Sequence, residues 1–245
     1  MRSCKYANAL RALLAGALLT ACASVPAAPE LDPGTLYDYL GPRQLTFTKR
    51  ISNLGDTTAF IKVEVAEIIY NEQGEPREPA FDSADRPLVA SPTRLIIPAG
   101  GSRELRLVYR QARPAERYFR LRFVPVAPTT DDLATLPIPE REQYRQAVSA
   151  RVGLMKAIGG VVLVSPRPSY FKTDIAQQGS SLRVTNNGNT TVVLEDLALC
   201  QATGTCEQGR TVHIRPGHTF TSAAQEGRRF GFTLREGEHT RRYAP

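Results

Sequence analysis

Two copies of one six-residue pattern constrain the fold of this chain more than any other feature of its sequence. Asn-x-Gly-(Asp/Asn)-Thr-Thr occurs at 53–58 and again at 186–191, each time between two runs rich in β-forming residues. Asn and Gly accept positive φ at low cost, so each copy predicts a strand, a tight turn and a second strand, paired as a hairpin. A strand, a Pro/Gly turn and another strand follow each copy, at 94–109 and 211–223. The same pair in the same order predicts two tandem β-sandwiches.

The strands around these turns alternate between apolar and polar residues, as antiparallel strands with one buried face do. The residues expected to face a core are Ile61, Val63, Val65, Leu105, Leu107, Tyr109, Phe119, Leu121 and Phe123. The 18 prolines and 18 glycines of the chain favour many short strands over long helices. We therefore expect an all-β protein.

Residues 129–147 break the strand pattern, because they are polar and contain two prolines. We expect a surface loop with a helical turn there. A long apolar strand at about 150–165 follows, and Pro166 and Pro168 mark the boundary between the domains. The predicted divisions are a signal peptide at 1–27, a first domain at 28–165 and a second domain at 166–245.

The N-terminus has the pattern of an export signal. Three basic residues precede an apolar run at 12–19, and small residues follow it. The apolar run is too short for a transmembrane helix with ordinary flanks. We expect cleavage near residues 24–28 and a soluble mature protein. The alternative is a lipid on Cys22, because Leu-Thr-Ala-Cys at 19–22 is similar to a bacterial lipobox.

The cysteines also bear on the compartment. Cys4 and Cys22 fall in the export signal, which leaves Cys200 and Cys206, separated by five residues. In an exported protein this pair predicts a disulfide that closes a small loop. A metal site is the weaker interpretation, because no second Cys/His pair lies close by in the sequence.

Composition argues against two broad function classes. The net charge of +7 would suit nucleic-acid binding, but the arginines are scattered and no aromatic-plus-basic signature, zinc spacing or recognition helix accompanies them. The three histidines all lie late in the chain, and no nucleophile, zinc-protease or phosphate-loop motif occurs. We expect no nucleic-acid partner, no catalytic residue, no metal and no cofactor.

Several segments resemble the periplasmic chaperones of chaperone–usher pilus assembly, the PapD-like family. They are LVASPTRLIIPAGGSRELRLVYR at 88–110, ERYFRLRFVPVAP at 116–128, VSARVGLMKAIGGVVLVSPR at 148–167, LRVTNNGNTTVVLEDLALC at 182–200 and TVHIRPGHTF at 211–220. The Cys200–Cys206 pair also fits. The order and spacing of these segments make the resemblance specific, and it is strongest to the alternate branch that serves common-pilus and colonisation-factor fimbriae.

The resemblance implies two immunoglobulin-like domains set at an angle, with a cleft between them. It implies a chaperone that binds pilin or fimbrial subunits, each of which lacks its final strand, and that donates its own G strand to the open core. An outer-membrane usher then receives the subunit. Because an exposed apolar edge tends to aggregate, we expect the unbound protein to guard it; the alternatives are a self-capping homodimer and the loop 129–147 folded over the edge.

The predicted donor G strand, about 150–165, is apolar on both faces over 157–164. One face would pack in the chaperone's own core and the other in a partner, where each buried branched aliphatic side chain contributes roughly 1.5–3 kcal/mol. The residues predicted to enter the subunit are Val152, Leu154, Ile158, Val162 and Val164. The alternative is an ordinary central strand of a sandwich.

In the family, two basic residues hold the C-terminal carboxylate of the subunit, one on the first strand and one on the G strand. This sequence departs from that pattern, because the nearest G-strand position is apolar and nothing before residue 45 aligns cleanly with the early arginine. The candidate anchors are Lys156 and Arg151 on the donor strand, and Arg43, Lys49 and Arg50 on the opposite wall. A solvated surface charge is the alternative interpretation of each.

Arg167 opens the second domain. The resemblance implies an ion pair near here that sets the inter-domain geometry, with Asp174, Glu195 or Asp196 as partner, and an exposed linker arginine is the alternative.

Two rival functions use the same fold. An immunoglobulin-like surface lipoprotein or adhesin would be anchored through Cys22. A pilin subunit is disfavoured, because a pilin is normally a single incomplete domain and this chain reads as two complete ones.

Overall fold

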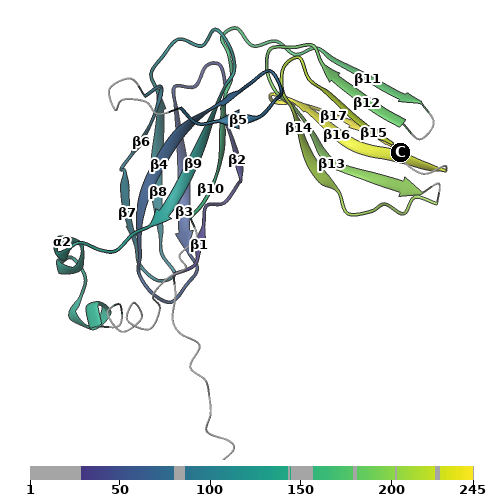
Figure 1. Cartoon of the computed structure of the whole chain (residues 1–245). Coiled ribbons are helices and arrows are strands. Elements are labelled where there is room, and N and C mark those ends of the chain that lie inside the picture. The colour runs from purple at the N-terminus through teal and green to yellow at the C-terminus, as the bar shows by residue number, and fades with distance from the viewer. Residues whose placement is uncertain are drawn as a thin grey trace, which may run out of the picture.

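The computed structural model describes residues 29–79, 86–142, 144, 157–178, 181–201, 203–223 and 227–244. Their strands form two β-sandwiches that meet at an angle, as Figure 1 shows. Strands from Leu31 to Val164 build the first sandwich, and strands from Thr173 to Tyr243 build the second. The prediction of an all-β, two-sandwich fold is confirmed, whereas the expected signal peptide and Cys22 lie outside the described residues.

The first sandwich has two facing sheets. One contains, in spatial order, β1 (Leu31–Asp32), β3 (Thr46–Asn53), β8 (Ser102–Tyr109) and β6 (Leu88–Ser91). The other, called here the β10 sheet, contains β2 (Tyr37–Leu40), β10 (Ile158–Val164), β9 (Arg117–Pro125) and β4 (Ala59–Tyr70), with β5 (Pro76–Arg77) and β7 (Arg94–Ile97) paired to β4. β2 runs parallel to β10, and the other neighbours in this sheet run antiparallel.

The second sandwich repeats this plan on a smaller scale. One sheet contains β11 (Thr173–Gln178), β12 (Ser181–Asn186) and β15 (Thr219–Ala223), and the other contains β14 (Arg210–Ile214), β13 (Val192–Gln201), β16 (Arg228–Glu236) and β17 (His239–Tyr243). β13 shifts register against both neighbours around Asp196, whose φ of 52° is in the left-handed region. A local bulge of this kind increases strand twist.

The two Asn-x-Gly turns connect facing sheets and do not form hairpins. β3 and β4 lie in different sheets of the first sandwich, and β12 and β13 lie in different sheets of the second. The hairpin prediction was therefore wrong. Alternation and turn residues indicate where a strand ends, but the sheet to which the next strand belongs depends on what the turn contacts.

The asparagine of each copy makes those contacts. Asn53 is fully buried, and its Nδ2 donates to the carbonyl oxygens of Thr57 and Ile97. Asn186 is equally buried and donates to the carbonyls of Thr190 and Ile214. Each asparagine therefore ties its turn to the end of a strand in the opposite sheet, which satisfies buried backbone carbonyls at the crossover.

Each sandwich encloses its own apolar core. The residues predicted to face a core in the first sandwich do so, and Val65 packs against the core from a partly buried position. The second core is built from Leu182, Val184, Val192, Leu194, Leu197, Ile214, Phe230, Phe232 and Leu234. The alternation of the strands thus predicted the buried faces correctly.

The segment 129–147 contains a helix, α2 (Thr130–Ala134). Thr129 and Asp132 form a capping box, in which each side chain accepts a hydrogen bond from the other residue's backbone N–H. A small apolar cluster centred on Phe60 holds the described part of the segment beside β4 and β7, on the side of the sheet away from β10. Neither α2 nor any other helix of the described residues has the length and apolar character needed to cross a membrane.

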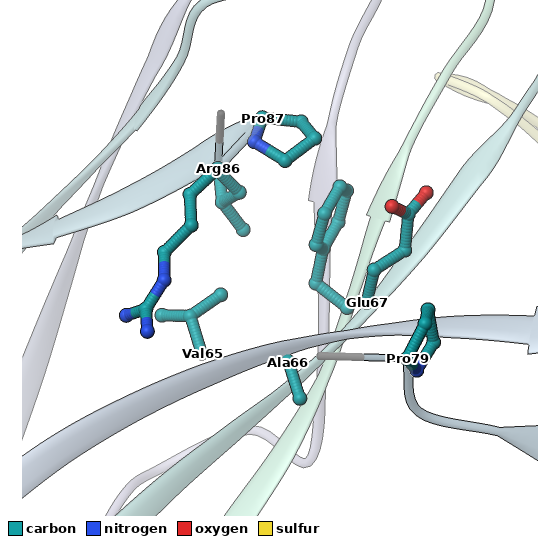
Figure 2. A pocket seen from close by; sticks show the side chains of 8 residues that line it. Val65, Ala66, Glu67, Pro79, Arg86 and Pro87 are labelled. Carbon is teal, nitrogen blue, oxygen red and sulfur yellow. The ribbon is translucent and has the colours of Figure 1, made fainter. Parts of the chain in front are cut away.

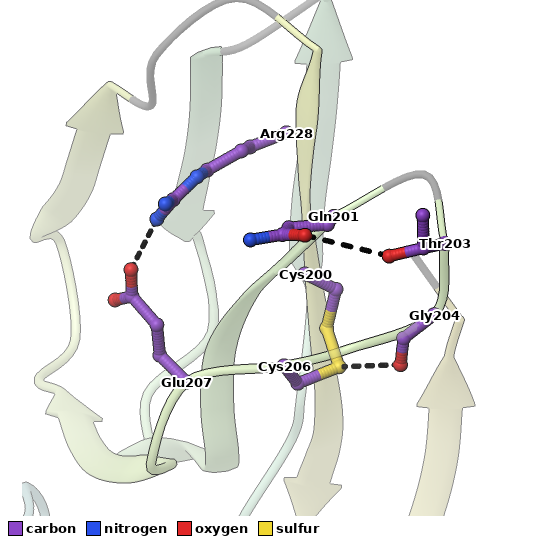
Figure 3. Close-up of a disulfide and its surroundings, with 7 residues drawn as sticks. All are labelled: Cys200, Gln201, Thr203, Gly204, Cys206, Glu207 and Arg228. Atoms are coloured by element: carbon purple, nitrogen blue, oxygen red, sulfur yellow. Dashed lines mark hydrogen bonds and ion pairs between the residues drawn. A yellow bond between two sulfur atoms is a disulfide. The ribbon is translucent and has the colours of Figure 1, made fainter.

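Cys200 and Cys206 form the predicted disulfide, which Figure 3 shows at the end of β13. Cys200 is buried and Cys206 is exposed, and the bridge closes the short loop between them. An ion pair between Glu207 and Arg228 ties the same loop to β16. The disulfide prediction is confirmed.

Candidate functional site

β10 has a neighbour on both sides over most of its length. It pairs with β9 over Ile158–Val164 and with β2 over Val161–Val164. β2 therefore occupies the edge of the β10 sheet next to these last residues, and the predicted donor strand is not an edge strand there.

The burial of the donor candidates on β10 corrects part of the prediction. Val162 and Val164 are 1% and 0% exposed and belong to the core of the first sandwich. Side chains already buried in the protein's own core are not free to fill a partner's core. Ile158 is partly buried and packs against the same core, and the remaining candidates, Val152 and Leu154, lie outside the described residues.

The beginning of β10 is the part that lies at the sheet edge. β2 starts opposite Val161, so among the described strands Ile158–Gly160 pair with β9 alone. A hollow of about 300 Å³ borders this stretch, and its lining is Leu36, Tyr37, Arg120, Leu121, Arg122 and residues 157–161. Backbone groups at such an edge are what an added strand binds.

Two glycines shape this end of β10. A Cβ at Gly159 would lie 1.8 Å from the carbonyl oxygen of Leu121, and one at Gly160 would lie 2.5 Å from that of Leu36. Any side chain at either position would displace backbone on one side of the strand. Glycine therefore keeps the beginning of β10 close to both of its neighbours.

The three predicted carboxylate anchors that the structure describes, Lys49, Arg50 and Arg43, differ in their surroundings. Lys49 is 4% exposed, and its Nζ lies 2.8 Å from the Asp38 carboxylate, so its charge is balanced inside the first sandwich. Arg50 is exposed on β3, and Arg43 is exposed in the turn that follows β2.

Lys156 and Arg151 lie outside the described residues and stay predictions. Among the predicted anchors in the described chain, the structure argues against Lys49. Its buried charge is already balanced by Asp38, and separating a buried ion pair is costly. Arg43 and Arg50 are exposed, and their role as anchors stays a prediction.

Arg120 and Arg122 are basic side chains near β10 that the sequence reasoning did not select. They project from β9 away from the core, and Glu78 accepts hydrogen bonds of 2.6–2.7 Å from both guanidinium groups. Burial opposes ionisation of Glu78, but the hydrogen bonds from Arg122 and Arg120 bring its pKa below the usual range. The alternation of Tyr118, Arg120 and Arg122 against the core residues of β9 was the available signal.

Glu116 joins the two sandwiches. Its carboxylate accepts hydrogen bonds from the backbone N–H of Thr191, from the Thr191 hydroxyl at 2.5 Å and from the Tyr118 hydroxyl at 2.6 Å. Burial raises the pKa of Glu116, and these hydrogen bonds offset part of that rise. Thr191 is the last residue of the second Asn-x-Gly pattern, so the turn of one sandwich docks on the other.

A second junction joins β2 to β14. The His213 ring stacks on Tyr37 with centroids 3.8 Å apart, and His213 Nε2 lies 2.5 Å from the Tyr39 hydroxyl. Arg235 lies 4.2 Å from the centroid of the Tyr39 ring and forms a 2.6 Å ion pair with Glu195. Burial, and then the charge of Arg235, lower the pKa of His213 to about 4, so the neutral imidazole accepts the Tyr39 hydrogen bond at neutral pH.

The inter-domain linker is arranged differently from the family expectation. The backbone N–H of Arg167 donates to the carbonyl of Arg113. Two of the candidate ion-pair partners are engaged elsewhere, because Glu195 pairs with Arg235 and Asp174 accepts from Asn187. Arg167 itself is exposed, and the side-chain contacts described here between the sandwiches include those of Glu116 and His213.

A further hollow, of about 210 Å³, lies beside β4 and is drawn in Figure 2 with Val65, Ala66, Glu67, Pro79, Arg86 and Pro87 around it. The Glu67 carboxylate is bound by Arg117 through two hydrogen bonds of 2.5 and 2.6 Å. Among the described residues no group of His, Cys, Asp and Glu side chains is arranged to hold a metal ion. The carboxylate that borders this hollow is already bound to Arg117. We therefore place the candidate site at β10 and not here.

No family model matches the chain. Among curated proteins, it is 26% identical over 238 residues to a "Probable fimbrial chaperone EcpB" of Klebsiella pneumoniae, with 96% of both chains covered. A protein of the same name from a second strain of that species, Klebsiella pneumoniae strain 342, matches to the same extent, at 26% identity over 238 residues and 96% of both chains.

Solved structures show the same likeness. The class 5 fimbriae chaperone CfaA matches with a TM-score of 0.53 at 18% identity, over 88% of this chain and 100% of that one. The Pseudomonas aeruginosa CupB2 chaperone matches with a TM-score of 0.51 at 12% identity, over 86% of this chain and 98% of that one. The similarity to fimbrial chaperones predicted from sequence is confirmed, and the fold is the two-domain fold of these structures.

Proposed function

We propose that this protein is a periplasmic chaperone for fimbrial subunits, which it binds by strand addition at β10 and delivers to an outer-membrane usher. The observation that carries the proposal is the similarity to proteins named probable fimbrial chaperones over 96% of the chain. The export signal pattern at 1–27 supports the periplasmic location. On this proposal, residues 28–165 form the subunit-binding domain and 166–245 the second domain.

The open beginning of β10 supports strand addition. Ile158–Gly160 lie at the sheet edge beside a hollow, and the chain that leads to them carries Val152 and Leu154 in the same register as Ile158. We propose that these upstream side chains enter the subunit, where each contributes roughly 1.5–3 kcal/mol. Val162 and Val164 then fix the base of the donor strand in the chaperone's own core.

A surface lipoprotein or adhesin is the second candidate, and the lipobox-like sequence before Cys22 favours it. Mass spectrometry of the mature N-terminus separates the two. A free N-terminus near residues 24–28 supports the soluble chaperone, and a diacylglyceryl group on Cys22 supports the anchored protein.

The function is tested by co-expressing the full chain with a fimbrial subunit of the same bacterium. We expect Val152→Asp combined with Leu154→Asp to lower the amount of co-purified subunit at least tenfold, because charged side chains do not enter an apolar core. The matched control is Gly153→Asp combined with Met155→Asp, which introduces the same two negative charges in the opposite register of the same segment.

Thermal unfolding of both variants shows whether the chaperone itself stays folded. Equal recovery of the subunit with the double variant and the wild type, at unchanged melting temperature, would overturn the donor-strand assignment. Loss of the subunit with both the double variant and the control would mean that subunit binding does not depend on which face of the strand carries the charge.

A further inference from the structure

β2 lies between β10 and the second sandwich and makes contacts with each of them. On its inner side, Leu40 is fully buried in the first core and the Asp38 carboxylate pairs with Lys49. On its outer side, Tyr37 and Tyr39 contact His213. β2 is short, and its ladder with β10 spans Val161–Val164.

We propose that His213 is a positioning residue that, from the second sandwich, holds β2 on β10 and so sets how much of the β10 edge is open to a partner strand. The inference rests on the proposed function for its consequence, since the partner strand is that of a fimbrial subunit. The contacts between His213 and β2 do not depend on any partner. The Nε2–hydroxyl distance of 2.5 Å to Tyr39 and the 3.8 Å ring stack on Tyr37 are the contacts that carry it.

The chemistry of the contact depends on the charge of His213. The charged and titratable groups that face the imidazole are Tyr37 and Tyr39 from β2, Arg235 from β16 and Glu195 from β13. A proton on Nε2 removes the acceptor for the Tyr39 hydroxyl and places a cation near Arg235. Glu195 offsets this only in part, because its carboxylate already pairs with Arg235.

Release of β2 would lengthen the open edge. With β2 in place, β9 is the only described strand that pairs with Ile158–Gly160, and the Leu36 carbonyl lies beside Gly160; without β2 the unpaired edge would extend to Val164. The hollow beside β10 includes Leu36 and Tyr37 in its wall, so a displaced β2 would also widen it. His213 would therefore control both the length of the strand that can pair and the space beside it.

Two backbone hydrogen bonds report directly on the contact between β2 and β10. The Val161 N–H donates to the Leu36 carbonyl at 2.8 Å, and the Ser165 N–H donates to the Leu40 carbonyl at 3.0 Å. Hydrogen exchange of these two amides in the full chain, corrected for intrinsic exchange rates, therefore measures how often β2 opens.

In wild-type protein we expect protection of these amides to be full above about pH 6.5 and to fall as the pH drops toward 4. The folded-state pKa of His213 lies below its usual value of 6.5, so protons bind the open state more tightly. His213→Ala should raise exchange at both amides roughly tenfold at pH 7, the order expected for one lost hydrogen bond and its stacking. His213→Phe keeps a ring for Tyr37 but cannot titrate, so the pH dependence should disappear.

Thr211→Ala, at an exposed position of the same strand, is the control and should leave both amides unchanged. If His213→Ala proves unstable, Tyr39→Phe removes the same hydrogen bond and keeps the ring of β2. Unchanged exchange at Val161 and Ser165 in either variant, or a change confined to amides of β14, would overturn the proposal. Since no fimbrial protein is present in this experiment, its outcome is separate from a failure of the co-expression experiment.

Discussion

At the scale of single residues, two buried asparagines have the same role in the two sandwiches. Asn53 and Asn186 each place an amide N–H₂ between the carbonyl of their own turn and a strand end in the opposite sheet. Their Oδ1 atoms accept from the backbone N–H of Gly55 and Gly188. Each amide side chain donates at least two hydrogen bonds and accepts at least one, whereas a serine hydroxyl has a single donor and an ionised aspartate has none.

We expect Asn186→Ala to destabilise the protein by about 2–4 kcal/mol, because it leaves two buried carbonyls and one N–H without their partner. Chemical denaturation of the second-sandwich transition measures this loss. Asn187→Ala is the matched control, since Asn187 is the exposed neighbour in the same turn. A loss below about 0.5 kcal/mol for Asn186→Ala would contradict the role assigned to the buried amide.

At the scale of the element, the last residues of β10 are covered on both faces by other parts of the molecule. Val162 and Val164 face the first core. Leu163, on the opposite face, is 3% exposed and lies between Tyr39 and Tyr118, both of which contact the second sandwich. The apolar surplus that suggested a partner is therefore explained in part by the junction between the domains.

The alternation of side chains between the two faces of β10 gives a prediction. Val162→Asp should unfold the first sandwich, because it buries an unpaired carboxylate at a cost of several kcal/mol. Val161→Asp should leave the fold intact, because Val161 points the other way and lines the open hollow. Thermal unfolding and soluble yield distinguish the two, and an unchanged melting temperature for Val162→Asp would disprove the observed register.

The disulfide also belongs to this scale, since it closes one short loop at the end of β13. Cys200 and Cys206 are six positions apart, for which loop-closure entropy gives a stabilisation of about 2 kcal/mol. We expect Cys200→Ser with Cys206→Ser to lower the free energy of unfolding by that amount. The wild type should lose a similar amount in a reducing buffer, and the variant should not respond to the reductant.

At the scale of the whole molecule, a few side-chain contacts join the two sandwiches, and we expect them to set the angle between the domains. Glu116 binds the turn that ends at Thr191, and His213 binds β2. Arg215 adds a cation–π contact, 3.5 Å from the centroid of the Tyr70 ring. An interface of this kind depends on the geometry of a few groups more than on buried area, so single substitutions should alter it.

Glu116→Ala removes the acceptor for the Thr191 N–H and hydroxyl and should loosen the junction. We expect a larger radius of gyration by small-angle X-ray scattering and faster proteolysis in the linker, with little change in the secondary structure measured by circular dichroism. Glu104→Ala, which removes an exposed carboxylate on β8, is the control. Identical scattering curves for Glu116→Ala and the wild type would show that other contacts fix the angle.

The sequence predicted the architecture well because the relevant signals are local. Alternation along a strand decides which face is buried, and it identified Phe119, Leu121 and Phe123 correctly. The cysteine pair was close enough in sequence for its bridge to be predicted. The order of the segments was sufficient to predict the similarity to fimbrial chaperones, and the comparisons confirm that similarity.

The tertiary structure alone decided the contacts between segments far apart in the chain. The sequence could not show that Lys49 pairs with Asp38, that Glu116 binds Thr191 or that β2 covers the end of β10. Periodicity gives the direction of a side chain, but the group that it meets depends on which strands become neighbours. The sequence determined that the chain forms two sandwiches with an apolar strand before the linker, and the packing of the sandwiches decided how much of that strand remains open.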